Sequence, residues 1–222
     1  MTHTVHPFAH RLGILRDWRS RWFAKRGTYQ EFLRSDVLLR EFLEKRLKGF
    51  YVSSIEMERN EKSLKILVAT SRPGLIIGRG GEGSEKLKAD IMKFVKKHSL
   101  AVPGDVKIEI SEVRSPESNA AIVAHMVAEG LEKRMPFRRI LKQTADKVMA
   151  NRDVLGVRIA LAGRLGGADM ARHEEIKKGR IPLQTFRADI DFAKARALIP
   201  QDELGIKVWI YKGEVFEDMP TK

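Results

Sequence analysis

The chain has 222 residues and contains no cysteine. Without cysteine it can form no disulfide framework, no thiol nucleophile and no thiolate metal site. No stretch approaches the ~18 apolar residues that a membrane-spanning helix needs. The N-terminal segment lacks the apolar core and the small-residue cleavage site of a signal peptide. These absences predict an intracellular protein of a reducing compartment, without a membrane partner.

Patterns typical of enzymes are also missing. His173-Glu174-Glu175 is the one place where a histidine adjoins two carboxylates, and no second histidine stands at the spacing of a metal-ligand set. No G-K-[ST] follows the glycines, as a Walker loop requires. The sequence contains no nucleophile elbow, and no two carboxylates can be assigned to each other as a catalytic pair. The sequence therefore predicts no catalytic residue, no metal site and no cofactor.

Positive charge is what the sequence has in excess. Lysine and arginine total 42 against 29 acidic residues, which gives a formal net charge of +13. An excess of that size attracts polyanions at long range. Nucleic acid fits it best, because nothing in the sequence suits a membrane. Hydrophobic residues make up 43% of the chain, enough for the cores of two small domains.

The first half of the chain predicts a basic arm over residues 1–27 and an α+β unit over residues 28–114. The order in the unit is helix, strand, strand, glycine loop, helix, strand, with the small sheet covered on one face. The first helix is expected at residues 36–48, with Asp36 as its N-cap. A turn at residues 59–62 joins the first two strands.

Residues 115–214 predict a second α+β domain, with two helices packed on a mainly antiparallel sheet. Ser115-Pro116 supplies an N-cap and a first helical residue, and Pro136 begins the second helix. Alternating apolar residues then indicate strands, with a charged stretch at residues 172–178 among them. Residues 215–222 form a short tail.

Gly78, Gly80 and Gly83 match G-x-G-x-x-G, so a dinucleotide site, and with it a nucleotide-dependent oxidoreductase, has to be considered. That site needs a strand running straight into the loop and a carboxylate about 20 residues later. Here Pro73 interrupts the approach, and residues 99–102 contain no carboxylate. The strands also suggest a hairpin and no parallel crossovers. These features disfavour a dinucleotide site.

The same glycines fit the GxxG loop of a KH domain, formed by Gly78, Arg79, Gly80 and Gly81. A loop without side chains at its ends lets a nucleic-acid backbone approach closely. The helix that follows offers unpaired N–H groups and a positive dipole end to phosphate. The candidate residues of the apolar groove beneath the bases are Ile77, Leu87 and Val68. The alternative is a plain turn at a helix start, which the element order and the net charge disfavour.

Several segments carry a resemblance to a known family. They are RPGLIIGRGGE (residues 72–82), GRLGGADMAR (163–172), GRIPLQTFRADID (179–191), KVWIYKGE (207–214) and WRSRWF (18–23). Taken together and in this order along residues 5–214, the segments resemble the bacterial-type small-subunit ribosomal protein S-three family, whose members carry a KH domain. The resemblance implies that residues 28–114 form a type II KH domain.

The resemblance also implies a function. It suggests a structural constituent of the cytoplasmic ribosome, in the head of the small subunit, with small-subunit rRNA, mRNA and neighbouring ribosomal proteins two, ten and fourteen as partners. In this family, cations on the second C-terminal-domain helix line the mRNA entrance and help to unwind mRNA. The matching positions are Arg138, Arg139 and Lys142. Their spacing places them on one patch, although an ordinary solvated helix face has the same pattern.

Further residues are expected to contact rRNA. They are Arg11, Arg19, Arg21, Trp22, Arg164, Arg172, Arg180 and Arg187. Some have structural alternatives: the glycines around Arg164 also suit a tight turn with positive φ, and Arg187 can pair with a nearby aspartate. Trp209 and Tyr211 suit either stacking on bases or on a partner, or burial beneath the helices.

The chain departs from the family pattern in two places. The loop interior Arg79-Gly80 has one cation where relatives often have two, which predicts a weaker hold on phosphate. Residues 193–204 lack the usual Thr and Tyr-Gly pattern and include Pro200, so no RNA contact is assigned there. Besides a ribosomal role, a free-standing KH-domain RNA-binding regulator or assembly factor stays open.

Overall fold

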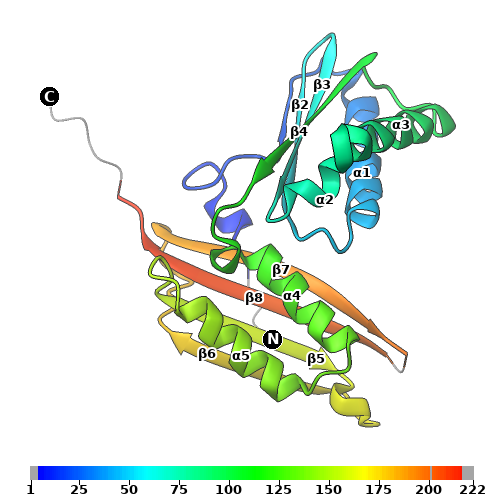
Figure 1. Ribbon diagram of the computed structural model, residues 1–222. Helices are drawn as coiled ribbons and strands as arrows, with labels where there is room; N and C mark the ends of the chain where they lie inside the picture. Colours follow the sequence, from blue (N-terminus) through cyan, green and yellow to red (C-terminus); the bar gives the residue numbers. More distant parts are fainter. Residues whose placement is uncertain (1–4, 201, 217–222) are drawn as a thin grey trace, which may run out of the picture. The chain divides into compact units, whose positions relative to one another are not determined.

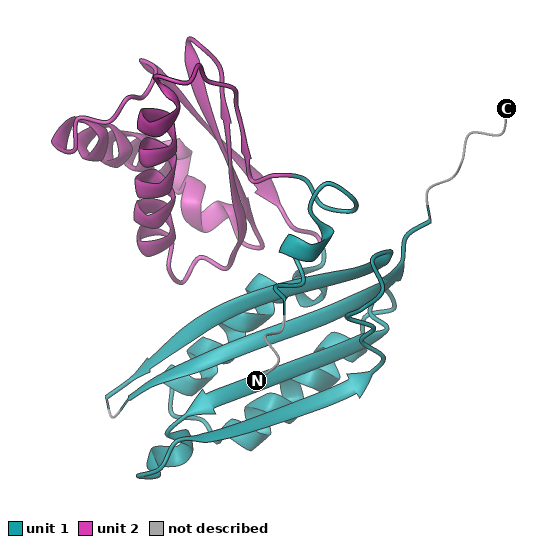
Figure 2. Ribbon diagram, turned by 180° about the vertical axis from the view of Figure 1, so that it is seen from behind, with its two compact units in different colours: residues 1–17, 115–222 teal, residues 18–114 magenta. Residues whose placement is uncertain are grey.

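The computed structural model describes residues 5–200 and 202–216. The chain divides into two units, residues 18–114 and residues 1–17 with 115–222 (Figure 2). The expected basic arm is therefore shared: residues 5–17 belong with the C-terminal domain and residues 18–27 with the other unit. Most of the predicted tail, residues 217–222, lies outside the described residues.

The unit of residues 18–114 has a four-stranded sheet with its helices on one face (Figure 1). Its elements are β1 (Ser20–Arg21), α1 (Tyr29–Arg46), β2 (Val52–Arg59), β3 (Ser63–Thr70), α2 (Pro73–Ile77), the 3-10 turn η2 (Arg79–Gly81), α3 (Glu82–Lys97) and β4 (Asp105–Glu112). The strand order is β1-β2-β3-β4. Leucine and isoleucine side chains from α1, α2 and α3 pack on those of the strands, which gives the α+β fold that the sequence predicts.

Two expectations about the order and pairing of the elements in this unit were wrong. The short helix α2 before the glycines was not predicted, because five residues beginning at a proline carry no helical periodicity. β3 and β4 pair in parallel, joined through α2 and α3, and β1 and β2 pair in parallel, joined through α1, so the chain does make parallel crossovers. That argument against a dinucleotide site therefore fails. Neither difference alters the predicted helix-covered sheet.

Helix α1 begins seven residues before Asp36, which is consequently not an N-cap. The Asp36 carboxylate is buried and forms an ion pair with Arg59 at 2.9 Å between Oδ1 and Nη2. It also accepts a hydrogen bond of 2.7 Å from the Trp22 indole N–H. Arg59 donates further to the Ser35 hydroxyl and the Ala101 carbonyl. Burial lowers the pKa of Arg59, and the Asp36 charge opposes that shift.

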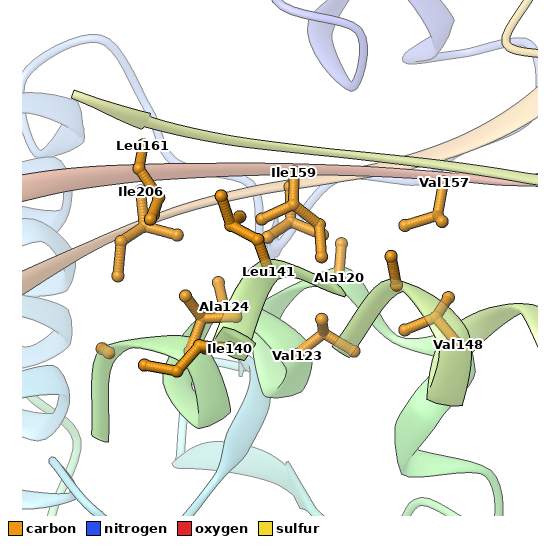
Figure 3. Close-up of a cluster of buried hydrophobic side chains, with 14 of the residues drawn as sticks. Ala120, Val123, Ala124, Ile140, Leu141, Val148, Val157, Ile159, Leu161 and Ile206 are labelled. Atoms are coloured by element: carbon orange, nitrogen blue, oxygen red, sulfur yellow. The ribbon is translucent and has the colours of Figure 1, made fainter. Parts of the chain in front are cut away.

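The other unit packs two helices on one face of an antiparallel sheet, as predicted. Its elements are η1 (Ala9–Arg11), η3 (Pro116–Ser118), α4 (Ala120–Glu132), α5 (Phe137–Met149), β5 (Gly156–Gly163), η4 (Leu165–Gly167), β6 (Arg172–Gly179), β7 (Ala188–Ile199) and β8 (Asp202–Glu214). The strand order is β6-β5-β8-β7. Figure 3 shows Val157, Ile159 and Leu161 of β5 meeting Val123 of α4 and Leu141 of α5.

The start of α4 differs from the expectation. Ser115 precedes a 3-10 turn, η3, that begins at Pro116, and Asn119 caps α4 by accepting hydrogen bonds from the N–H groups of Ala121 and Ile122. The carboxylate of Asp191 accepts a further hydrogen bond, of 2.8 Å, from the N–H of Ala120. β7 and β8 continue to pair up to Ile199↔Asp202, so the atypical segment extends a hairpin.

Candidate nucleic-acid interface

The glycine loop lies on the surface between α2 and α3. Gly78, Gly80 and Gly81 have φ of 73°, 60° and 88°, values that side chains with a Cβ rarely adopt. A Cβ built on Gly80 would meet nothing within 4 Å, so the tip stands in open space. Gly78, Arg79 and Gly80 are all exposed. A nucleic-acid backbone can therefore approach the loop.

Gly83, the last glycine of the G-x-G-x-x-G pattern, has a packing role. Its Cβ would fall inside contact distance of the Ile76 carbonyl oxygen and 2.8 Å from that of Ile77. Only glycine lets the end of α2 cross the first turn of α3 this closely. The three glycines of the pattern, Gly78, Gly80 and Gly83, thus all serve the junction at which the loop joins α2 to α3.

The charges at the loop are mixed. Arg79 is exposed and has no ion-pair partner among residues 5–200 and 202–216. Glu82 and Glu85 stand in the first turn of α3, where a phosphate would meet the positive end of the helix dipole. Lys86 offsets one of them through an ion pair of 2.5 Å with Glu82. The N–H of Gly78 already donates to the Gly74 carbonyl at 3.0 Å, so the charge that residues 78–81 offer to a phosphate is that of Arg79.

The apolar groove proposed from sequence needs correction. Val68 and Leu87 are 0% and 5% exposed and belong to the core, so neither can touch a base. Ile77 is 38% exposed, and Leu75, which the sequence analysis did not single out, is 56% exposed. Both stand on α2, with the buried Ile76 between them. No sequence pattern indicates α2, and this one-turn helix is what turns the Ile76 side chain inward.

The three cations of α5 are exposed. Arg138 forms an ion pair with Glu174 on β6, with 3.1 Å between Nη2 and Oε1, and the contact raises the pKa of Arg138. Arg139 and Lys142 are exposed and form no ion pair with any described part of the chain. The apolar stripe of α5, with Ile140, Leu141 and Val148, turns into the core (Figure 3).

Arg11 does not lie on a surface, and the predicted rRNA contact there is wrong. Its side chain is 0% exposed. Its guanidinium donates hydrogen bonds to the carbonyls of Pro7, Leu183, Thr185 and Ala188, at 2.6–3.2 Å. Burial lowers its pKa below the ordinary value. Arg11 anchors residues 5–17 to the C-terminal domain.

Other residues of the expected arm are held within the unit of residues 18–114. Arg21 forms ion pairs of 2.8 Å with both Glu56 and Glu58, which raise its pKa. The Trp22 ring packs against Tyr29 and Phe32, and its N–H is committed to Asp36. These contacts give both residues a structural role, whereas Arg19 is exposed.

The remaining predicted contacts fall into two groups. Arg164 donates to the Ala168 carbonyl at 2.9 Å, in a turn where Gly163, Gly166 and Gly167 all have positive φ, so the tight-turn interpretation holds. Arg187 does form an ion pair, but with Glu214 at 2.5 Å and not with a nearby aspartate; Asp189 pairs with Arg16. Arg172 and Arg180 are exposed and have no ion-pair partner within the described ranges.

Trp209 and Tyr211 are not beneath the helices. They lie on the opposite face of the sheet, where Tyr211 packs with Ala188 and Ile190. No described helix is long and apolar enough to cross a membrane. Within residues 5–200 and 202–216, no group of three His, Asp or Glu could hold a metal ion.

Comparison with known proteins identifies both domains. A KH domain model matches residues 38–118, and the model of the ribosomal protein S3 C-terminal domain matches residues 127–210. The chain is 44% identical over 222 residues to small ribosomal subunit protein uS3 of Clostridium novyi, covering all of this chain and 96% of that protein. The protein of the same name from Methylococcus capsulatus is 43% identical over the same span, again with 96% of its length covered. That of Coxiella burnetii is 44% identical over 220 residues, which cover 99% of this chain and 93% of the relative. The chain belongs to the small ribosomal subunit protein uS3 family.

Proposed function

We propose that this chain binds rRNA in the head of the small subunit, beside ribosomal proteins two, ten and fourteen, and that α5 helps to unwind mRNA at the entrance of its channel. Membership of the uS3 family gives the chain a structural, non-enzymatic role in the cytoplasmic ribosome. The finer assignments rest on where the cations lie.

The observation that carries the unwinding proposal is the exposed pair Arg139 and Lys142. Both side chains project from α5, whose other side packs into the core. Neither forms an ion pair with a carboxylate in the part of the chain that the structure describes. Arg138 adds a third charge, which its contact with Glu174 holds in place. Cations on a rigid support replace counterions on phosphates, and the released ions favour binding.

Unwinding requires the cations to prefer one form of the mRNA. A ligand shifts an equilibrium only by its differential affinity for the two states. A row of cations beside a narrow path holds the single strand that fits the path, whereas a hairpin does not fit. The strand that has melted is therefore held, and the hairpin reforms less often.

The loop at residues 78–81 supports rRNA binding. Its exposed glycines admit the sugar–phosphate backbone, and the N-terminus of α3 faces the same place. With Arg79 as its one cation and two glutamates close by, we expect a modest contribution from this loop. Most of the affinity then comes from the cations elsewhere.

The test is a triple charge reversal, Arg138→Glu, Arg139→Glu and Lys142→Glu, in purified small subunits. The three residues lie outside the core, so we expect assembly to be nearly normal. Transit of ribosomes through an mRNA hairpin should slow about tenfold, since a reversed cation no longer releases a counterion from the phosphate that it faces. Transit through unstructured mRNA should change little.

The matched control is Arg138→Lys with Arg139→Lys, which keeps every positive charge. We expect near-normal hairpin transit, because the proposed effect depends on charge and not on bidentate geometry. If the triple reversal crosses hairpins at the normal rate, α5 has no part in unwinding.

A further inference from the structure

The C-terminal sheet has a second face, on which no α-helix of the described residues packs; the N-terminal segment reaches it at Phe192, where the His6 ring lies 4.7 Å away between centroids. Figure 2 shows this face. Because Val157, Ile159 and Leu161 of β5 point into the helix-covered core, the alternate residues Arg158, Ala160 and Ala162 point to the other side. Strand register places their neighbours on β8 and β7. These are Trp209, Lys207 and Gly205 on β8, and Phe192, Lys194 and Arg196 on β7.

Small residues make a shallow hollow in this face. Ala160, Ala162 and Gly205 leave its floor low, and the hollow has a volume of about 160 Å³. The long side chains around it are mostly basic. They are His173, Lys194, Arg196 and Lys207. We call these residues and their floor the basic hollow.

The charge arrangement in the basic hollow is unfavourable for the protein alone. Lys194 and Lys207 are direct cross-strand partners. Like charges directly opposite each other destabilise a sheet. Neither lysine forms an ion pair within the described ranges, while Arg196 and Arg158 are paired with Glu203 and Glu175. A bound polyanion would supply the missing counter-charge.

Two aromatic rings and a guanidinium border the basic hollow. The rings of Phe192 and Trp209 have centroids 5.1 Å apart, and the Arg158 guanidinium lies 4.7 Å above the Trp209 ring. The Arg158 side chain stays 31% exposed. Single-stranded RNA is recognised by stacking of bases on aromatic rings and on guanidinium planes, combined with cations that follow the backbone.

We propose that the basic hollow binds a single strand of RNA, with phosphate between Lys194 and Lys207 and a base against Arg158. The inference rests on the proposed role in RNA binding, but it uses a different surface from α5 and the glycine loop. An acidic protein segment would satisfy the lysines equally well. It would not use the cation–π pair of Arg158 and Trp209, so RNA is the better match.

The test uses the full chain and a fluorescent, short, mixed-sequence oligoribonucleotide without secondary structure. Lys207→Glu and Lys194→Glu should each weaken binding about tenfold, and the log–log slope against salt should fall by roughly 0.7 for each phosphate that is no longer neutralised. Thermal stability should rise in both variants, because each puts opposite charges across the strands. Lower affinity with higher stability is a result that misfolding does not give.

Arg152→Glu is the matched control, because Arg152 is exposed in the turn between α5 and β5 and carries the same charge. It should change RNA affinity by less than about twofold. An equal loss of affinity in the control would show unspecific attraction and overturn the proposal. Unchanged affinity in the lysine variants would also overturn it, as would binding of polyglutamate at this face in place of RNA.

RNA binding by the basic hollow and mRNA unwinding by α5 can be rejected independently of each other. Loss of RNA affinity in Lys207→Glu together with normal hairpin transit in the α5 variant would retain the basic hollow and reject unwinding by α5. The reverse pattern would reject the basic hollow alone.

Discussion

At the scale of single residues, the buried arginines set the limit of what sequence could predict. Arg11 and Arg59 look like any other cation in the chain, yet both are among its least exposed residues. Apart from the Pro7 carbonyl, the partners of these two arginines lie 23 or more residues away in sequence, and no local pattern encodes such pairs. Asp36 was assigned to a helix cap for the same reason: the residue type suits a cap, and only the fold shows Arg59 beside it.

The Asp36–Arg59 pair gives the first stability prediction. Asp36→Ala leaves the Arg59 charge buried without a counter-charge, and we expect the free energy of unfolding to fall by about 3–5 kcal/mol. Urea unfolding of the full chain measures it. Asp90→Ala is the control, since its pair with Arg46 is exposed and is worth about 0–1 kcal/mol. Equal losses of stability in the two variants would contradict the account.

At the scale of elements, alternation and spacing were good guides. Period-two patterns located β2, β3, β4, β5 and β8, and helical stripes located α3, α4 and α5. α2 was missed because it is one turn long, and the start of α1 was missed because its first turns contribute few apolar residues to the core. Part of the groove assignment failed with α2, since the pattern did not separate buried Leu87 from exposed Leu75.

The α2–α3 crossing gives the second stability prediction. Gly83→Ala puts a Cβ against backbone carbonyls of α2, which cannot move aside as a flexible side chain does, and we expect destabilisation of about 1–3 kcal/mol. Gly74→Ala has open space and lies within α2, so it should be neutral or stabilising by up to about 1 kcal/mol. Thermal unfolding of both variants measures these changes in stability. A neutral Gly83→Ala would show that the crossing does not depend on glycine.

At the scale of the whole molecule, charge and element order predicted the class of partner, and the family resemblance predicted the role. Membership of the uS3 family favours the ribosomal role over a free-standing regulator. The formal net charge of +13 did not tell which cations face a partner. The fold divides them: Arg11 and Arg59 hold the chain together, while Arg139 and Lys142 stay exposed.

The central claim is that the exposed face of α5 lies against mRNA. Because the chain has no cysteine, Lys142→Cys creates a single attachment point for a chelated iron that releases hydroxyl radicals. Small subunits containing the labelled chain and a bound mRNA are then analysed for strand breaks, with Arg152→Cys as the matched label in the turn that follows α5. We expect a cluster of breaks in the mRNA from position 142 and far fewer from position 152. Intact mRNA, with breaks only in rRNA, would contradict the claim.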